Sequence, residues 1–264
     1  MQYIGALIGD YCGSIYEWNN THEENPNAID ILNNGKFTDD SVLTVAVMDW
    51  LVNTEGKESL SPYLRKWAKK YPDAGYGGKF KAWLASDGDE KVNSYGNGAG
   101  MRVSPCAFYA NTLEECLDLA KKSAEITHCH EEGIKGAQAV AEAIYLARSG
   151  ASKHDIRRVI EDDFGYNLGK QMDEIGRRGH KFDATCQVTI PEALICLFNS
   201  NDLIDLIQKS IWIGGDSDTI AAIACSIGEP YYGIPHFIME KMKEKLPDDM
   251  KETIIEFNKV MLLR

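Results

Sequence analysis

Apolar residues recur at intervals of three and four positions along most of this chain, which is the spacing of amphipathic helices. Several runs follow a helix-start signal: Ser61-Pro62 opens a run to about residue 71, and residues 112–115 form a capping box before the next run. A further run over 134–144 stops at Gly150. No segment alternates clearly as an exposed strand would, so the pattern predicts an all-α fold.

Similar spacing predicts helices elsewhere in the chain. Apolar runs over 42–51 and 220–227 each follow an acidic segment. A second capping box at 189–192 is expected to open a helix over 193–198, and Asn201 to cap a helix over 203–212. The last run, over 250–261, is also helical in spacing.

The least regular stretch is 73–105, where glycine, serine and asparagine concentrate. A linker between two domains would have a similar composition, but neither side forms a self-sufficient pattern. We therefore expect a single domain over residues 1–264 that carries a functional loop.

Composition narrows the classes of function. The net charge of −12 comes without a basic cluster, which disfavours a protein that binds nucleic acid. The N-terminus lacks a signal-peptide pattern, and the longest apolar run, 42–52, is too short to span a bilayer. The seven cysteines never occur as CxxC, which indicates reduced, buried thiols. The expected location is the cytoplasm, without membrane contact.

Two acidic clusters precede predicted helices: Thr38-Asp39-Asp40-Ser41, and residues 214–219 with Asp216, Asp218 and Thr219. Adjacent carboxylates repel one another unless a cation or a helix N-terminus offsets the repulsion, and hard divalent cations prefer such oxygen ligands. Simple N-capping explains one cluster alone. A matched second cluster makes capping a weaker explanation, because capping needs only one oxygen in each place. From the residues alone, simple capping and a site for two ions both stay open as interpretations.

Other candidate residues lie between and before these clusters. Residues 5–17 interleave small and apolar positions, as a tightly packed helix would, and end at Glu17, which is either a surface residue or a placed acid. His128 and His130 are two positions apart and would face opposite sides of a helix, so we expect a helix entry, with His128 alone as a ligand contact.

The glycine-rich segment 93–102 lacks both common nucleotide-binding patterns. Its backbone N–H groups could cradle phosphates without lysine, whereas the alternative is an ordinary turn. In the cradle, Gly98 is expected at positive φ, with Arg102 as the one nearby cation.

Five blocks in order make the sequence similar to the ADP-ribosylglycohydrolase family, the (ADP-ribosyl)hydrolases of the dinitrogenase-reductase-activating glycohydrolase type. The blocks are GALIGD with Glu17, FTDDS at 37–41, GNGAGMRVSP at 96–105, TH at 127–128, and the segment 213–235. The sequences at residues 16–18 and 93–97 resemble those of the family branch that acts on O-linked ADP-ribose more than those of the arginine-specific branch.

The resemblance implies a single orthogonal helical bundle with a binuclear metal cleft for two Mg²⁺ ions, or Mn²⁺ in some members. Carried over by position, one ion is held by Thr38, Asp39, Asp40 and Asp218, and the other by Glu17, Asp216, Asp218 and Thr219. Glu17, Asp39 and Asp40 are the implied catalytic residues, with Glu17 as the acid. The implied substrate contacts are Ser94, Tyr95, Gly96, Asn97, Gly98, Met101 and His128.

The resemblance thus implies a magnesium-dependent hydrolase that releases ADP-ribose from a protein or small-molecule acceptor, and we expect a monomer. Nucleic acid is expected only as an ADP-ribosylated substrate. Two alternatives stay open: a two-metal phosphoesterase or pyrophosphatase, and a catalytically silent ADP-ribose-binding relative.

Overall fold

The computed structural model describes residues 1–21, 23–31, 34–86, 88, 90–176 and 182–264. Within them the chain forms 15 α-helices and one short 3₁₀ helix, and its one β-bridge, between Gly96 and Thr185, belongs to no strand. The all-α prediction is confirmed. No helix in these ranges is long and apolar enough to cross a membrane.

In chain order the helices are α1 (Gly5–Gly13), η1 (Pro26–Ala28), α2 (Asp39–Thr54), α3 (Ser61–Lys70), α4 (Gly78–Ala85), α5 (Gly98–Met101), α6 (Ser104–Tyr109), α7 (Leu113–Glu125), α8 (Glu131–Arg148), α9 (Lys153–Phe164), α10 (Met172–Gly176), α11 (Cys186–Asn199), α12 (Leu203–Trp212), α13 (Ser217–Tyr232), α14 (His236–Lys245) and α15 (Asp248–Met261).

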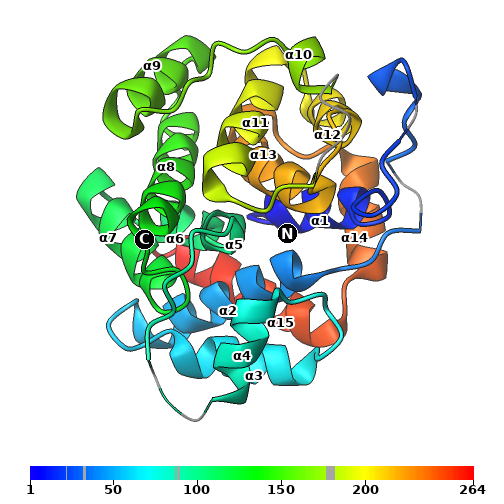
Figure 1. Cartoon of the computed structure of the whole chain (residues 1–264). Coiled ribbons are helices and arrows are strands. Elements are labelled where there is room, and N and C mark those ends of the chain that lie inside the picture. The colour runs from blue at the N-terminus through cyan, green and yellow to red at the C-terminus, as the bar shows by residue number, and fades with distance from the viewer. Residues whose placement is uncertain (22, 32–33, 87, 89, 177–181) are drawn as a thin grey trace.

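Helices α1 and α13 pack against each other in the middle of the molecule, although they come from opposite ends of the chain (Figure 1). In this view α2, α3, α4 and α15 lie below the pair, and α9, α11 and α12 lie above it. Short α5 contacts both α8 and α13. The starts of α2 and α13 therefore meet near α1 and α5.

Glycine explains how closely α1 approaches α13. A Cβ atom on Gly9 would lie 2.1 Å from the Ala221 carbonyl oxygen, and one on Gly13 would lie 2.6 Å from the Asp218 Cα. Any side chain at these positions would force the helices apart. The small residues in 5–13 thus confirm the prediction of a tightly packed helix.

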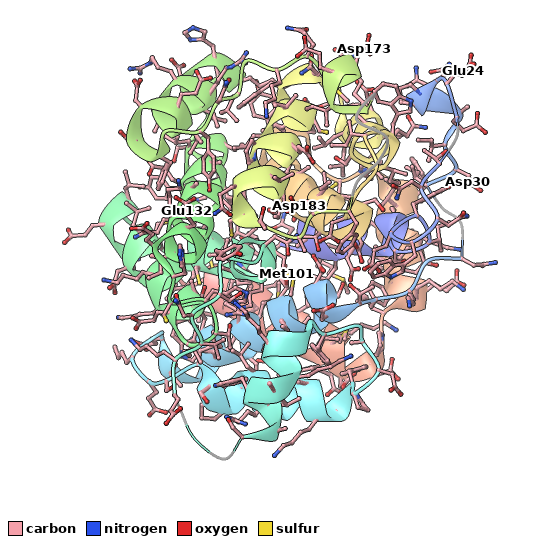
Figure 2. All side chains as sticks on the ribbon, viewed as in Figure 1. Glu24, Asp30, Met101, Glu132, Asp173 and Asp183 are labelled. Carbon is pink, nitrogen blue, oxygen red and sulfur yellow. The ribbon has the colours of Figure 1, made fainter. Side chains whose placement is uncertain are left out.

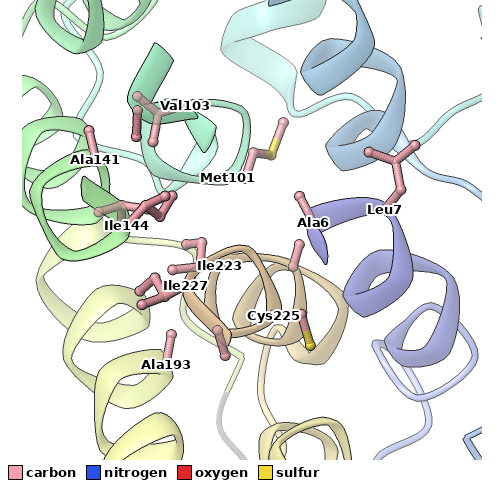
Figure 3. Close-up of a cluster of buried hydrophobic side chains, with 14 of the residues drawn as sticks. Ala6, Leu7, Met101, Val103, Ala141, Ile144, Ala193, Ile223, Cys225 and Ile227 are labelled. Carbon is pink, nitrogen blue, oxygen red and sulfur yellow. The ribbon is translucent and has the colours of Figure 1, made fainter. Parts of the chain in front are cut away.

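The apolar core surrounds α13. Figure 3 shows Ile223 and Ile227 of α13 near Ile144 of α8 and Ala193 of α11, while Cys225 lies on the side of α1. The side chains of these five residues are fully buried. All seven cysteines are free thiols and all but Cys129 are buried, as predicted from their spacing.

Several predicted helix starts are confirmed. The Thr112 hydroxyl accepts a hydrogen bond from the Glu115 N–H at 3.1 Å and caps α7. The His130 Nδ1 accepts from the Glu132 N–H at 3.1 Å and caps α8, so His130 belongs to a helix entry as predicted.

Two predicted starts are wrong. Helix α11 begins at Cys186 with Thr185 as its N-cap, so Thr189 lies inside the helix and its hydroxyl contacts the Asn97 side chain instead of capping. Pro191 lies inside the helix, in its second turn, where it leaves one helix hydrogen bond unmade. Helix α12 is capped by Asp202, whose carboxylate accepts from the Asp205 N–H at 2.8 Å, and not by Asn201.

The segment 73–105 contains helices that the prediction missed. Helix α4 buries Phe80 and Trp83 despite the glycines and serines that flank it. Helix α5 likewise forms within the glycine-rich segment. Glycine-rich composition indicates turns, but burial of aromatic side chains overrides this weak local preference.

Candidate functional site

The two acidic clusters lie at the starts of two helices. Asp39 and Asp40 are the first residues of α2, and Asp216 is the N-cap of α13 with Asp218 in its first turn. Gly214 and Gly215 precede α13 with φ of 71° and 78°, a left-handed turn that other residues rarely adopt. The fold therefore directs both clusters, with the positive ends of two helices, toward one place.

Asp10 connects α1 to the first cluster. Its fully buried carboxylate accepts hydrogen bonds from the Thr38 N–H at 2.9 Å, the Thr38 hydroxyl at 2.7 Å and the Ser41 N–H at 3.1 Å. The Ser41 hydroxyl donates to it as well. Asp10 thus caps α2 from another helix and holds Asp40 in position.

Two groups of carboxylates have ligand atoms within 4.8 Å of one another: Asp10 with Asp40 and Asp218, and Glu17 with Asp216 and Asp218. Asp218 belongs to both groups, as a bridging ligand would. The Thr219 hydroxyl donates to Asp40 at 3.1 Å. Asp39 belongs to neither group but faces the same pocket.

The position of Glu17 depends on a contact outside the helices. Glu17 follows the end of α1, and three residues later Asn20 pairs with Gly215: the Gly215 N–H donates to the Asn20 side chain at 3.0 Å, and Asn20 donates to the Gly215 carbonyl at 3.3 Å. This pair holds the segment after α1 against the turn that carries Asp216.

Burial and mutual repulsion raise the pKa values of the carboxyls in this cluster. Burial, with repulsion from Asp218, raises the pKa of Asp39 to about 8 and that of Glu17 to about 7. The pKa values of Asp40 and Asp218 are also raised well above the usual range, first by burial. The buried Asp40 Oδ1 has no hydrogen-bond partner in the described part of the chain. Crowded oxygen ligands with an unpaired buried atom fit divalent cations, so the cluster could hold metal ions.

A cavity of about 460 Å³, here called the central pocket, opens above these carboxylates. Asp39, Asp40, Asp216 and Asp218 lie at one side, and the glycine-rich segment with α5 forms another. Met101 of α5 lies near the middle of the molecule (Figure 2). The Asn97 side chain joins the two sides, because it donates to Asp216 at 2.7 Å.

The structure brings most of the predicted residues to this pocket. The residues that line it include Glu17, Asp39, Asp40, Ser94, Gly96, Asn97, Gly98, Met101, His128, Asp216, Asp218 and Thr219. Thr38 lies behind them, bonded to Asp10. Tyr95 is outside the described lining; it is 44% exposed and its ring stands edge-on to His130.

Two expectations about the glycine-rich wall are wrong. Gly98 is the first residue of α5 and does not have a positive φ; a Cβ atom there would lie 3.1 Å from the His128 ring, a tight contact that the ring would have to relieve by a small shift. Arg102 is fully buried, and it is not the one nearby cation, since Lys79 at the start of α4 also lines the pocket.

Sequence reasoning missed three features of the site. Asp10 was visible only as an acid inside a helix of small residues. Lys79 was hidden in the irregular segment. Trp18 and Phe182 stack at the pocket rim with ring centroids 4.7 Å apart, and both are exposed, at 76% and 45%. Exposed stacked aromatic rings beside a pocket are typical of a binding surface.

Comparison with known proteins agrees with this geometry. The model of the ADP-ribosylglycohydrolase family matches residues 3–263. ADP-ribosylhydrolase ARH3 of Mus musculus is 25% identical, with 98% of this chain and 88% of that protein aligned. ADP-ribosylarginine hydrolase Tri1 of Pseudomonas putida is also 25% identical, with 88% of this chain and 69% of that protein aligned.

One solved structure, titled ADP-ribosylglycohydrolase-related protein complex, superimposes with a TM-score of 0.72. The match covers 98% of this chain and 96% of that one at 19% identity, so it establishes the fold.

Proposed function

Since the chain belongs to the ADP-ribosylglycohydrolase family, we propose that it hydrolyses the glycosidic bond between ADP-ribose and a modified acceptor. The observation that carries the proposal is that Asp218 belongs to both groups of carboxylates that could hold a metal ion. It lines the same pocket as the glycine-rich segment. Such a pocket offers oxygen ligands for cations on one side, and on the other a wall with glycines at which a ligand can approach the backbone closely.

Two divalent ions, Mg²⁺ or Mn²⁺, would be held by the two groups of carboxylates, one of which includes Glu17 and both of which include Asp218. When bound, they supply Lewis-acid chemistry and a template for the ribose hydroxyls. Thr38 and Thr219 would orient the carboxylates, since their hydroxyls donate to Asp10 and Asp40.

The reaction adds the oxygen of water to the anomeric carbon, breaks the bond from that carbon to the acceptor, and gives one proton to the acceptor. Glu17 suits the transfer of that proton, because its carboxyl is half-buried and lines the pocket beside the other carboxylates. Trp18 and Phe182 lie on the same side, where a departing acceptor would contact them.

A panel of substrates tests the proposal. The protein would be incubated with Mg²⁺ and arginine-linked, serine-linked, polymeric or nucleic-acid-linked ADP-ribose, and products identified by mass. Release of free ADP-ribose from one or more is expected. Formation of AMP instead would indicate a pyrophosphatase, and ADP-ribose binding without turnover would indicate a silent relative; either result contradicts the proposal.

Replacement of Glu17 separates chemistry from binding. Glu17→Gln keeps the volume of the side chain but cannot transfer a proton, so turnover should fall on the order of a hundredfold or more. ADP-ribose affinity, measured by calorimetry in excess Mg²⁺, should change little. Lost binding with unchanged turnover per bound substrate would make Glu17 a structural residue.

A further inference from the structure

Three polar side chains are connected in a line that ends at the central pocket. The Arg102 Nη2 donates to the Thr127 Oγ1 at 2.8 Å and to the Ser123 carbonyl oxygen at 2.7 Å. The Thr127 Oγ1 is 2.9 Å from the Nδ1 of His128. Arg102 is fully buried, and Thr127 and His128 are 2% and 8% exposed, so water cannot easily replace these partners.

The direction of each hydrogen bond follows from the protons available. A guanidinium has donors only, so the Thr127 oxygen must accept from Arg102. The hydroxyl carries one proton, and among the described residues its remaining partner is the His128 Nδ1. If the hydroxyl also accepted from a protonated Nδ1, its own proton would have no acceptor among the described residues. The arrangement that uses every proton has the hydroxyl donate to an unprotonated Nδ1, which places the ring proton on Nε2.

His128 is also held in a neutral form. Burial first, and then the positive charges of Arg102 and Lys79, keep its pKa well below the usual range. The buried Nε and Nη1 of Arg102 have no hydrogen-bond partner among the described residues. At neutral pH the ring thus offers one N–H, at Nε2.

The Nε2 atom lies beside Gly96 and Gly98 in the wall of the central pocket, which His128 also lines. A Cβ atom on Gly98 would lie 3.1 Å from Nε2, and one on Gly96 would lie 3.6 Å from it. No hydrogen bond among the described residues uses this nitrogen, although the backbone of His128 is fixed by its N–H bond to the Ala124 carbonyl at 2.8 Å.

We infer that Arg102 and Thr127 are positioning residues that fix His128 as a neutral Nε2–H donor for an oxygen atom of the bound ligand. The ligand group must be an acceptor, and a phosphate oxygen of ADP-ribose has this chemistry; the identity of the ligand rests on the proposed function. The tautomer itself does not depend on that function.

Nuclear magnetic resonance tests the tautomer directly. Long-range ¹H–¹⁵N correlation spectra of the full chain would be recorded at neutral pH, and the signals of His128 assigned among the six histidines with His128→Gln. Wild type and Thr127→Ser should show an unprotonated Nδ1 and a protonated Nε2. A protonated Nδ1 in wild type would overturn the inference.

Binding of ADP-ribose tests the consequence. Thr127→Val matches the shape of threonine but cannot donate to Nδ1, so it should mix the two tautomers and weaken ADP-ribose binding about tenfold, the effect of one hydrogen bond. Thr127→Ser should restore both properties. Wild-type affinity in folded Thr127→Val would refute the positioning role.

The two proposals fail separately. If the wild-type protein shows the Nε2–H tautomer and binds ADP-ribose without cleaving any substrate of the panel, the positioning role stands and the hydrolase proposal falls. If the wild-type protein cleaves ADP-ribosylated substrates but shows both tautomers of His128, the hydrolase proposal stands and the positioning role falls. Thermal unfolding of each variant separates a loss of fold from a loss of positioning.

Discussion

Asp218 has more consequences than any other single residue of the site, because it belongs to both carboxylate groups. Asp218→Ala should reduce affinity for both divalent ions and lower hydrolysis by more than about a hundredfold. Calorimetric titration with Mg²⁺ and Mn²⁺ would measure affinity, and release of ADP-ribose would measure activity.

Asp118→Asn is the matched control for this change. Asp118 lies on α7 with a side chain 57% exposed and pairs with Lys122, so its loss should leave ion binding unchanged. If Asp218→Ala kept wild-type activity in buffer with only trace Mg²⁺, a site with two ions would be excluded.

Gly98 matters because a side chain there would contact the His128 ring, and not because its backbone needs a positive φ. The Cβ of Gly98→Ala would lie 3.1 Å from the His128 ring and push it away, so ADP-ribose affinity should fall about tenfold, while Gly98→Val should cost on the order of a hundredfold. Metal affinity should persist in both variants. Calorimetry with ADP-ribose and with Mg²⁺ would separate the two effects.

Gly100→Ala, two positions away on the same short helix, provides the comparison. Its Cβ would come no closer than 3.4 Å to Val140, an ordinary contact, so affinity should stay within about twofold. Equal losses in the Gly98 and Gly100 variants would attribute the effect to α5 as a whole.

At the scale of elements, the contact between α1 and α13 determines the site, because α1 carries Asp10 and α13 carries Asp218. Gly9→Ala would place a Cβ 2.1 Å from the Ala221 carbonyl oxygen and force the helices apart. We expect the free energy of unfolding to fall by about 1–3 kcal/mol or more, measured in urea. The variant should also lose affinity for divalent ions, which Gly100→Ala should keep.

A comparison of individual helices shows which helix starts can be located from the sequence. The start of α7, whose capping residue Thr112 lies next to the helix in sequence, was predicted correctly. The start of α11 was not, because Thr189 contacts Asn97 from another segment and so does not cap. A sequence pattern contains only residues that are close along the chain, whereas the Thr189 hydroxyl bonds to Asn97, which is distant in sequence.

At the scale of the molecule, the buried acids couple stability to pH and to metal ions. Burial raises the pKa values of Asp10 and Asp216 to about 6, of Glu17 to about 7 and of Asp39 to about 8. A raised pKa means that the folded state binds protons more tightly than the unfolded state. The stability from these groups is therefore complete at low pH and is lost as pH rises through 6–8.

Without metal, the free energy of unfolding should thus fall by roughly 2 kcal/mol between pH 6.5 and 8. This window also avoids the opposite contribution of His128, whose lowered pKa reduces stability only toward acid pH. Saturating Mg²⁺ should reduce the slope, because cations bind ionised carboxylates; a part should remain, since burial also raises the pKa values of Glu142 and Glu229, outside the cluster, to about 7. Urea unfolding in chelator and in Mg²⁺ would show the difference; equal slopes would argue against metal binding by these acids.

The sequence by itself determined the helical class, the reduced cysteines and the two acidic clusters, because periodicity, spacing and residue type are local properties. Only the tertiary structure decided the rest. Asp10 joins the clusters because α1 packs on α13 without intervening side chains, Lys79 reaches the pocket from α4, and Arg102 acts from within the core. Each depends on contacts between distant segments, and such contacts arise from packing that no local pattern contains.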